Sequence, residues 1–67
     1  MKVVDARGLS CPEPIMLTTQ AMKETKDEIK VLVSEPVQRT NVEKCVKNAG
    51  RKAETKAVGS EFEIIIR

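Results

Sequence analysis

Two prolines set two residues apart constrain the fold of this chain more than any other feature. Pro12 and Pro14 stand directly before a run of residues with helical spacing. Proline is tolerated in the first turn of a helix but breaks a helix interior, so a helix is predicted to begin at these residues and to run from Pro12 to about Lys26. The side of this helix that faces the core is predicted to carry Pro14, Ile15, Thr18, Ala21 and Met22, with Leu17 at its edge.

The other segments alternate between strand and helix patterns. β-branched or period-two runs predict four strands, at residues 2–7, 28–33, 53–58 and 61–67. Gly59-Ser60 forms a two-residue loop that suits a hairpin between the last two strands. The predicted order is β-α-β-α-β-β. We therefore expect an α/β (α+β) fold, namely a two-layer α/β sandwich of a four-stranded mixed sheet with two helices on one face.

A second helix is predicted between the second and third strands. Ser34-Glu35-Pro36 is interpreted as the stop of the second strand, and Thr40-Asn41-Val42-Glu43 has the form of a capping box with Thr40 as the N-cap. The apolar stripe of this helix includes Cys45, and Gly50 is placed to be the C′ residue. Cys45 is therefore predicted to be a core residue rather than a reactive thiol.

Composition excludes several classes of function. The 67 residues allow one domain, residues 1–67, and a share of 33% charged residues beside 40% hydrophobic ones is typical of a globular chain. A single aromatic residue and a net charge of +2 without a basic block argue against direct nucleic-acid binding. The chain has no His and only two Cys, so no metal site and no cofactor are predicted. No segment resembles a signal peptide or a membrane span, so we expect a cytoplasmic protein with reduced thiols.

Cys11 is the candidate catalytic residue. It lies just before Pro12, where the free N–H groups and the positive end of a helix dipole favour a thiolate. Two registers stay open, because either Cys11 is the N-cap or Ser10 is the N-cap and Ser10-Cys11-Pro12-Glu13 is a capping box. Both registers expose the sulfur. The carboxylate of Glu13 and the missing proline N–H groups oppose activation, so the prediction is an accessible, rigidly held thiol.

The residues Asp5-x-x-Gly8-Leu9-x-Cys11-Pro12-x-Pro14 resemble the signature of the TusA/SirA-like sulfur-carrier family, and the resemblance extends over essentially the whole chain. It implies a sulfur carrier or sulfurtransferase in which Cys11 accepts sulfane sulfur as a persulfide. The implied partners are a cysteine desulfurase or rhodanese-like donor and a downstream acceptor protein. Asn41-Val42-Glu43 departs from the acidic residue and Ile-Pro of tRNA-thiolating relatives. The resemblance therefore selects no pathway among tRNA thiolation, molybdenum-cofactor maturation, sulfur oxidation and selenium metabolism.

Other residues near Cys11 are assigned supporting roles. Gly8 is expected to provide the turn that aims Cys11, and Asp5 is expected to accept hydrogen bonds that fix the loop. The remaining supporting residues of the motif are Pro12, Glu13 and Pro14. Met16 is an apolar residue on the helix face that should meet water, one turn from Cys11, so a partner protein is expected to dock there. The expected docking surface consists of Leu9, Met16 and Arg39.

Two other functions remain open from the residues alone. Small α/β domains often bind RNA or proteins without chemistry, and the chain is mildly basic, which allows a non-catalytic regulatory module. Accessible cysteines also sense oxidants, which allows a thiol-redox regulator that pairs Cys11 with Cys45. The predicted core position of Cys45 argues against the redox pair.

Overall fold

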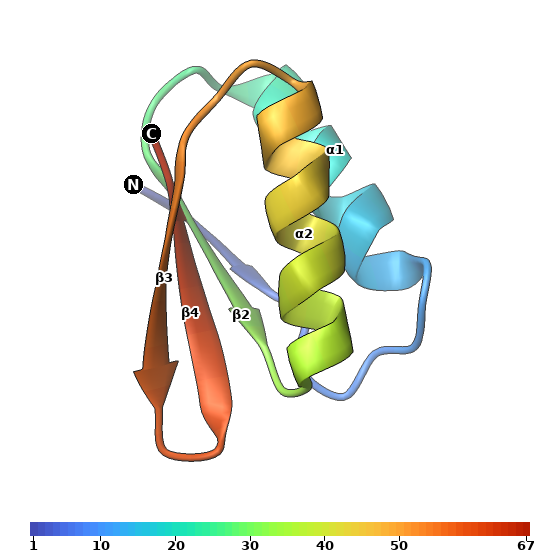
Figure 1. The fold of residues 1–67 in the computed structure, drawn as a ribbon. Helices are drawn as coiled ribbons and strands as arrows, with labels where there is room; N and C mark the ends of the chain where they lie inside the picture. The colour runs from blue at the N-terminus through green and yellow to red at the C-terminus, as the bar shows by residue number, and fades with distance from the viewer.

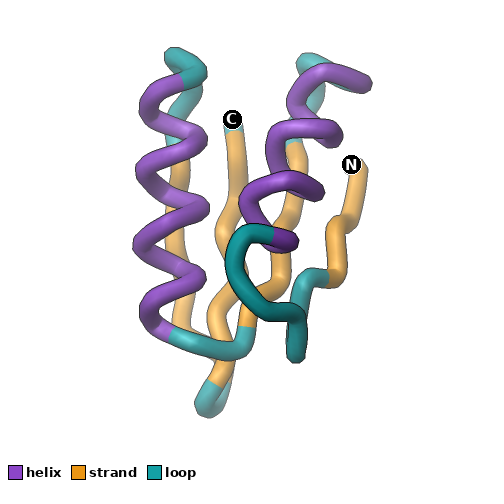
Figure 2. Tube along the Cα trace, turned by 90° about the vertical axis from the view of Figure 1, so that its right-hand side faces the viewer, coloured by secondary structure: helices purple, strands orange, loops and turns teal.

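The chain folds into one sheet covered on one face by two helices (Figures 1 and 2). The computed structural model describes all residues, 1–67. Its elements are β1 (Lys2–Asp5), α1 (Glu13–Glu24), β2 (Ile29–Val33), α2 (Pro36–Asn48), β3 (Ala53–Val58) and β4 (Glu61–Ile66). The predicted element order and the two-layer sandwich are confirmed.

The sheet is mixed, with the strand order β1-β2-β4-β3. β1 pairs with β2 in parallel, whereas β2 and β3 both pair with β4 in antiparallel orientation. Each helix follows a parallel strand and runs back along the sheet, so the N-terminal ends of both helices lie at the same end of the molecule (Figure 1). That end also holds the β3–β4 hairpin. Residues from three distant parts of the chain therefore meet there.

The core is aliphatic and lies between the sheet and the helices. Alternate residues of β2 point toward the helices and are fully buried, as period-two strands require. Burying each such side chain contributes roughly 1.5–3 kcal/mol. The ten hydrophobic residues that make up the core are Val4, Ala6, Ala21, Ile29, Val31, Val33, Val42, Val46, Ile64 and Ile66.

The predicted start of the second helix is wrong. α2 begins at Pro36 with Glu35 as its N-cap, four residues before the expected capping box. Proline fits the first helical position because its missing N–H would be unpaired there anyway, so Pro36 opens α2 instead of only ending β2. Thr40 lies inside the helix, where its hydroxyl donates to the Pro36 carbonyl at 3.2 Å. The side chain of Glu43 accepts a hydrogen bond from Thr55.

Both predicted registers for the start of α1 are also wrong. The N-cap is Pro12, and neither Ser10 nor Cys11 caps the helix with its side chain. The N–H of Glu13 instead donates to the Ser10 carbonyl at 2.9 Å, so a backbone turn leads into the helix. At its other end α1 stops at Glu24, two residues earlier than predicted.

The predicted end of α2 is confirmed. Gly50 has a φ of +77°, a left-handed conformation that only glycine adopts without strain. Its N–H donates to the Lys47 carbonyl at 3.0 Å, and the N–H of Arg51 donates to the Val46 carbonyl at 3.1 Å. These two bonds form a Schellman motif and satisfy the last carbonyls of the helix. Neither helix has the length and apolar character that crossing a membrane requires.

Candidate functional site

Cys11 lies in the turn between β1 and α1, directly before the N-cap of the helix, and is exposed as a free thiol. The helix starts immediately beyond it, since the N–H of Met16 donates to the Pro12 carbonyl at 3.0 Å. Pro14 occupies the second helical position and is buried. The Thr18 hydroxyl donates to the Pro14 carbonyl at 2.8 Å. The turn that presents Cys11 is therefore attached to a firmly packed helix start.

The loop before Cys11 is anchored to β2 and to the core. The N–H of the buried Ala6 donates to the Leu32 carbonyl at 2.8 Å, and the N–H of Gly8 donates to the Ser34 hydroxyl at 3.1 Å. Gly8 has a φ of +75°, which a residue with a side chain adopts only with strain. Leu9 is partly buried and packs against the core. These contacts fix the direction in which the chain reaches Cys11.

A charged cluster of Asp5, Arg7 and Glu61 lies at the start of this loop. The carboxylate of Asp5 accepts bonds from the Arg7 side chain at 2.9 Å on both of its oxygens, and from the Arg7 backbone N–H at 3.2 Å. Arg7 also reaches Glu61 of β4 at 3.3 Å. The hydrogen bonds from Arg7 lower the pKa of Asp5 to about 2. The same bonds raise the pKa of Arg7. Asp5 therefore fixes the loop as a carboxylate.

The electrostatic setting of Cys11 contains opposing contributions. The first turn of a helix carries unpaired N–H groups and partial positive charge, which stabilise an anion. In α1 the N–H of Ile15 has no acceptor in the protein, whereas Pro14 has no N–H to offer. The exposed carboxylate of Glu13 makes no ion pair and opposes a neighbouring negative charge. The arrangement therefore gives an accessible thiol beside a helix dipole.

Exposed apolar side chains lie near the N-terminal ends of α1 and α2. Met16 is 62% exposed, as its place on the outward face of α1 predicted. Val37, in the first turn of α2, is 57% exposed. Sequence analysis missed Val37 because it expected α2 to begin later. Had Pro36 been taken as the first helical residue, the outward position of Val37 could have been found.

Arg39, the third residue of the expected docking surface, is engaged within the chain. Its guanidinium lies 5.4 Å from the centre of the Phe62 ring, within cation–π range. It also pairs with Glu43 at 3.7 Å. The side chain is only partly exposed, so Arg39 covers the edge of the core more than it offers a free charge.

Cys45 lies far from Cys11 along the helices. Its Sγ is 3.2 Å from the Thr19 hydroxyl, and the residue is half-buried between α1 and α2 rather than fully in the core as predicted. Thr19, which contacts Cys45, lies six residues beyond Glu13, or about 9 Å along the axis of α1, and Cys11 precedes Glu13. A disulfide needs Cα atoms within about 7 Å. The geometry therefore does not favour the redox pair.

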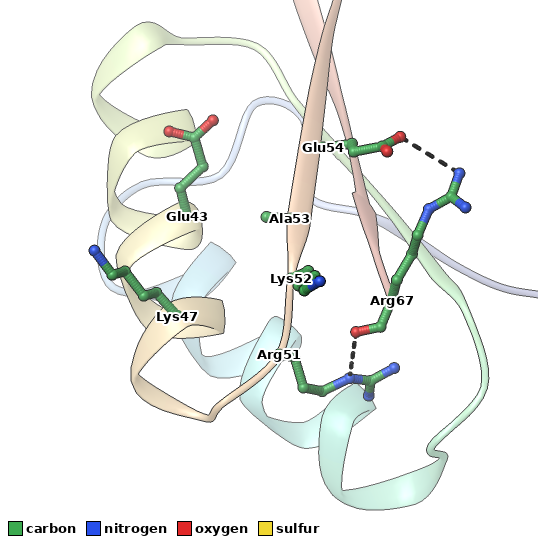
Figure 3. Close-up of a pocket in the computed structure, with 7 residues that line it drawn as sticks. All are labelled: Glu43, Lys47, Arg51, Lys52, Ala53, Glu54 and Arg67. Carbon is green, nitrogen blue, oxygen red and sulfur yellow. Dashed lines mark hydrogen bonds and ion pairs between the residues drawn. The ribbon is translucent and has the colours of Figure 1, made fainter.

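A shallow pocket of about 450 Å³ lies between α2 and β3 (Figure 3). Its two arginines are already engaged within the chain. Arg51 donates to the carbonyls that follow α1, at 2.8–3.2 Å, and Arg67 pairs with Glu28 and Glu54. The lining residues are Glu43, Lys47, Arg51, Lys52, Ala53, Glu54 and Arg67. The lining is almost entirely charged and includes neither Cys11 nor Cys45. No group of three His, Cys, Asp or Glu residues gathers as metal ligands.

Comparisons of this chain with family models, with curated proteins and with solved structures each give a match. The family model described as sulfurtransferase TusA matches residues 2–67. A protein of Archaeoglobus fulgidus, whose assigned name proposes a sulfur carrier, is 36% identical over 53 residues, which cover 76% of this chain and 69% of that protein. The crystal structure of a SirA-like protein from Desulfitobacterium hafniense superimposes with a TM-score of 0.91 at 27% identity, covering 98% of this chain and 95% of the other.

Proposed function

Because this chain belongs to the TusA sulfurtransferase family, we propose that it is a sulfur carrier that accepts sulfane sulfur as a persulfide on Cys11 and relays it to an acceptor protein. The observation that carries this proposal is the exposure of Cys11 on an anchored turn at the start of α1. A carrier needs a thiol that two different proteins can reach in turn. A small domain with its thiol at one tip meets that need.

The transfer can be written as two thiol exchanges. In the first, the Cys11 thiolate attacks the terminal sulfur of a persulfide on the donor. A new S–S bond forms at Cys11, the donor S–S bond breaks, and the donor leaves as a thiolate. In the second, an acceptor thiolate attacks the terminal sulfur on Cys11 and releases the Cys11 thiolate. Neither step requires an outside oxidant or reductant, because the sulfane sulfur keeps its oxidation state throughout.

The anchored loop supports this role by keeping the thiol in one place. Asp5 and Gly8 fix the approach of the chain, and Pro12 and Pro14 fix the start of α1. Glu13 is the remaining residue of the motif and stands exposed beside the thiol. Holding a reacting group in position in advance removes part of the entropic cost of transfer. The proposed supporting residues therefore act on position rather than on the chemical step.

The proposed donor is a cysteine desulfurase or a rhodanese-like protein, which would work with this carrier in the cytoplasm. Docking is proposed to involve Met16 and Val37, because exposed apolar side chains are common at protein interfaces. Leu9 contributes its exposed part, and Arg39 contributes at the margin. A surface this small favours brief contacts, which suit a protein that must leave one partner to meet another.

The test is the intact mass of the protein after incubation with a cysteine desulfurase and cysteine. We expect a gain of about 32 Da that a reducing thiol removes, because the added sulfur is held by an exchangeable S–S bond. Cys11→Ser should abolish the gain, and the matched control Cys45→Ser should retain it. Full loading of the Cys11→Ser protein would refute the proposal.

A further inference from the structure

β3 forms an open edge of the sheet and is longer than the edge strand on the other side. It has six residues against four in β1, and every residue of β3 after Ala53 is exposed. An edge strand presents unpaired N–H and C=O groups that can pair with another strand. Proteins commonly protect such edges by keeping them short, as β1 does here.

The backbone groups that face outward from β3 follow from the ladder with β4. Lys52 and Arg67 exchange two hydrogen bonds, at 3.3 and 2.8 Å, so they form a hydrogen-bonded pair. Such pairs recur at every second residue of an antiparallel ladder. The backbones of Glu54, Lys56 and Val58 therefore bond to β4. The groups left free to point away from the sheet belong to Ala53, Thr55 and Ala57.

We propose that β3 pairs with β3 of a second copy of this chain, in antiparallel orientation with Thr55 at the two-fold axis, to give a continuous eight-stranded sheet. In this register the outward groups of Thr55 meet those of Thr55 in the second copy. Ala53 likewise meets Ala57. All three outward residues then find hydrogen-bond partners.

The charges on β3 favour this register over its rival. With Thr55 on the axis, Glu54 lies opposite Lys56 of the second copy, and this pair occurs twice. The other register that pairs five residues has Lys56 on the axis, so two lysines would face each other. Opposite charges across a strand pair stabilise it, and like charges destabilise it. The sequence of β3 is therefore self-complementary in one register.

Both charged residues are available for this contact. Lys56 is exposed and makes no ion pair within the chain. The Glu54 side chain is 67% exposed, and its only ion pair is with Arg67, at 3.4 Å (Figure 3). β1 and β3 form opposite edges of the sheet. Because the exposed Cys11 follows β1, this dimer leaves the Cys11 thiols of both copies accessible.

The decisive experiment uses opposite charge changes in two preparations of the protein. Glu54→Lys places two lysines opposite each other, and Lys56→Glu places two glutamates opposite each other, so each variant alone should dimerise at least about tenfold more weakly. An equimolar mixture of the two variants restores both pairs and should recover the affinity of the native protein. Sedimentation equilibrium up to about 1 mM protein, the weak end of specific association, measures all four samples: the native protein, each variant alone and the mixture. A native chain that stays monomeric, or a mixture no tighter than its components, would overturn the proposal.

A second pair of variants tests the backbone contact. Thr55→Pro removes an outward N–H without touching the bonds to β4, and should abolish dimerisation. Thr55→Val is the matched control, because it keeps the N–H and the β-branched shape and loses only the hydroxyl that bonds Glu43. It should dimerise like the native protein. Equal dimerisation of both Thr55 variants would also overturn the proposal, and so would loss of dimerisation in Thr55→Val. Binding of strands from other proteins at this edge, without self-association of the chain, would overturn it as well.

Discussion

The two cysteines of this chain lie in contrasting surroundings. Cys11 is exposed in the turn before α1, whereas Cys45 is half-buried in α2 with its Sγ 3.2 Å from the Thr19 hydroxyl. The contrast arises from their neighbours in the sequence. Pro12 and Pro14 fix the start of α1 just after Cys11, but Cys45 follows Val42 by three residues and shares its side of α2. Backbone context, rather than residue type, decides which thiol a partner can reach.

The largest expected effect is the difference in alkylation rate between the two thiols. In the folded protein, iodoacetamide should modify Cys11 at least about tenfold faster than Cys45, because reactivity requires access to the sulfur. In denaturant the two rates should become similar. Peptide mass spectrometry over time measures both sites in one sample. Equal rates in the folded protein would show that the two settings do not differ as described.

The next prediction concerns Met16, which is proposed to contact the partner protein that loads Cys11. Met16→Asp should slow sulfur loading of Cys11 by about tenfold, since it puts a charge into a proposed apolar contact. Stability should hardly change, because Met16 is 62% exposed. Gln20→Asp, at another exposed position of α1, is the matched control and should load normally. A large drop in melting temperature for Met16→Asp would instead mean that this side chain belongs to the core.

A smaller effect is expected when the glycine in the loop before Cys11 and the glycine at the end of α2 are each replaced. Gly8→Ala and Gly50→Ala should each cost about 1–2 kcal/mol of stability, because both glycines have positive φ. Only Gly8→Ala should also slow loading of Cys11, since Gly8 lies in the anchored loop and Gly50 does not. Thermal melts and loading rates measured on both variants test this. Equal loading of the two would mean that the loop does not position the thiol.

The fold was largely predictable because the chain signals its elements locally. The period-two alternation of apolar residues in β2 and the Gly59-Ser60 loop predicted the strands, and Gly50 predicted the end of α2. The start of α2 was missed because Glu35-Pro36 can both end a strand and open a helix. Tertiary packing decides between these outcomes, and the packing contacts of Pro36 cannot be inferred from a single sequence.

The site was predictable where it depended on neighbouring residues. The exposure of Cys11 and Met16 followed from the prolines and the helical period. The bond from Gly8 to Ser34 was not foreseen, because it joins residues 26 positions apart. The same holds for Arg39, whose contact with Phe62 depends on how α2 sits over β4. Contacts between distant residues require the packed structure.

The smallest expected effect is the pH dependence of the Asp5–Arg7 contact. Arg7 holds the pKa of Asp5 at about 2, against an ordinary value of about 3.9. Between these values the unfolded chain binds the proton more readily, so the contribution of this contact to stability is fully present above about pH 4 and is lost as the pH falls through about 2. The pair is exposed, so the contribution is small. NMR titration of the Asp5 carboxyl should give a midpoint near 2 in the native protein and a higher one in Arg7→Gln. A native midpoint near 4 would mean that Arg7 does not hold the carboxylate in solution, and the loop before Cys11 would then lose one of its anchors.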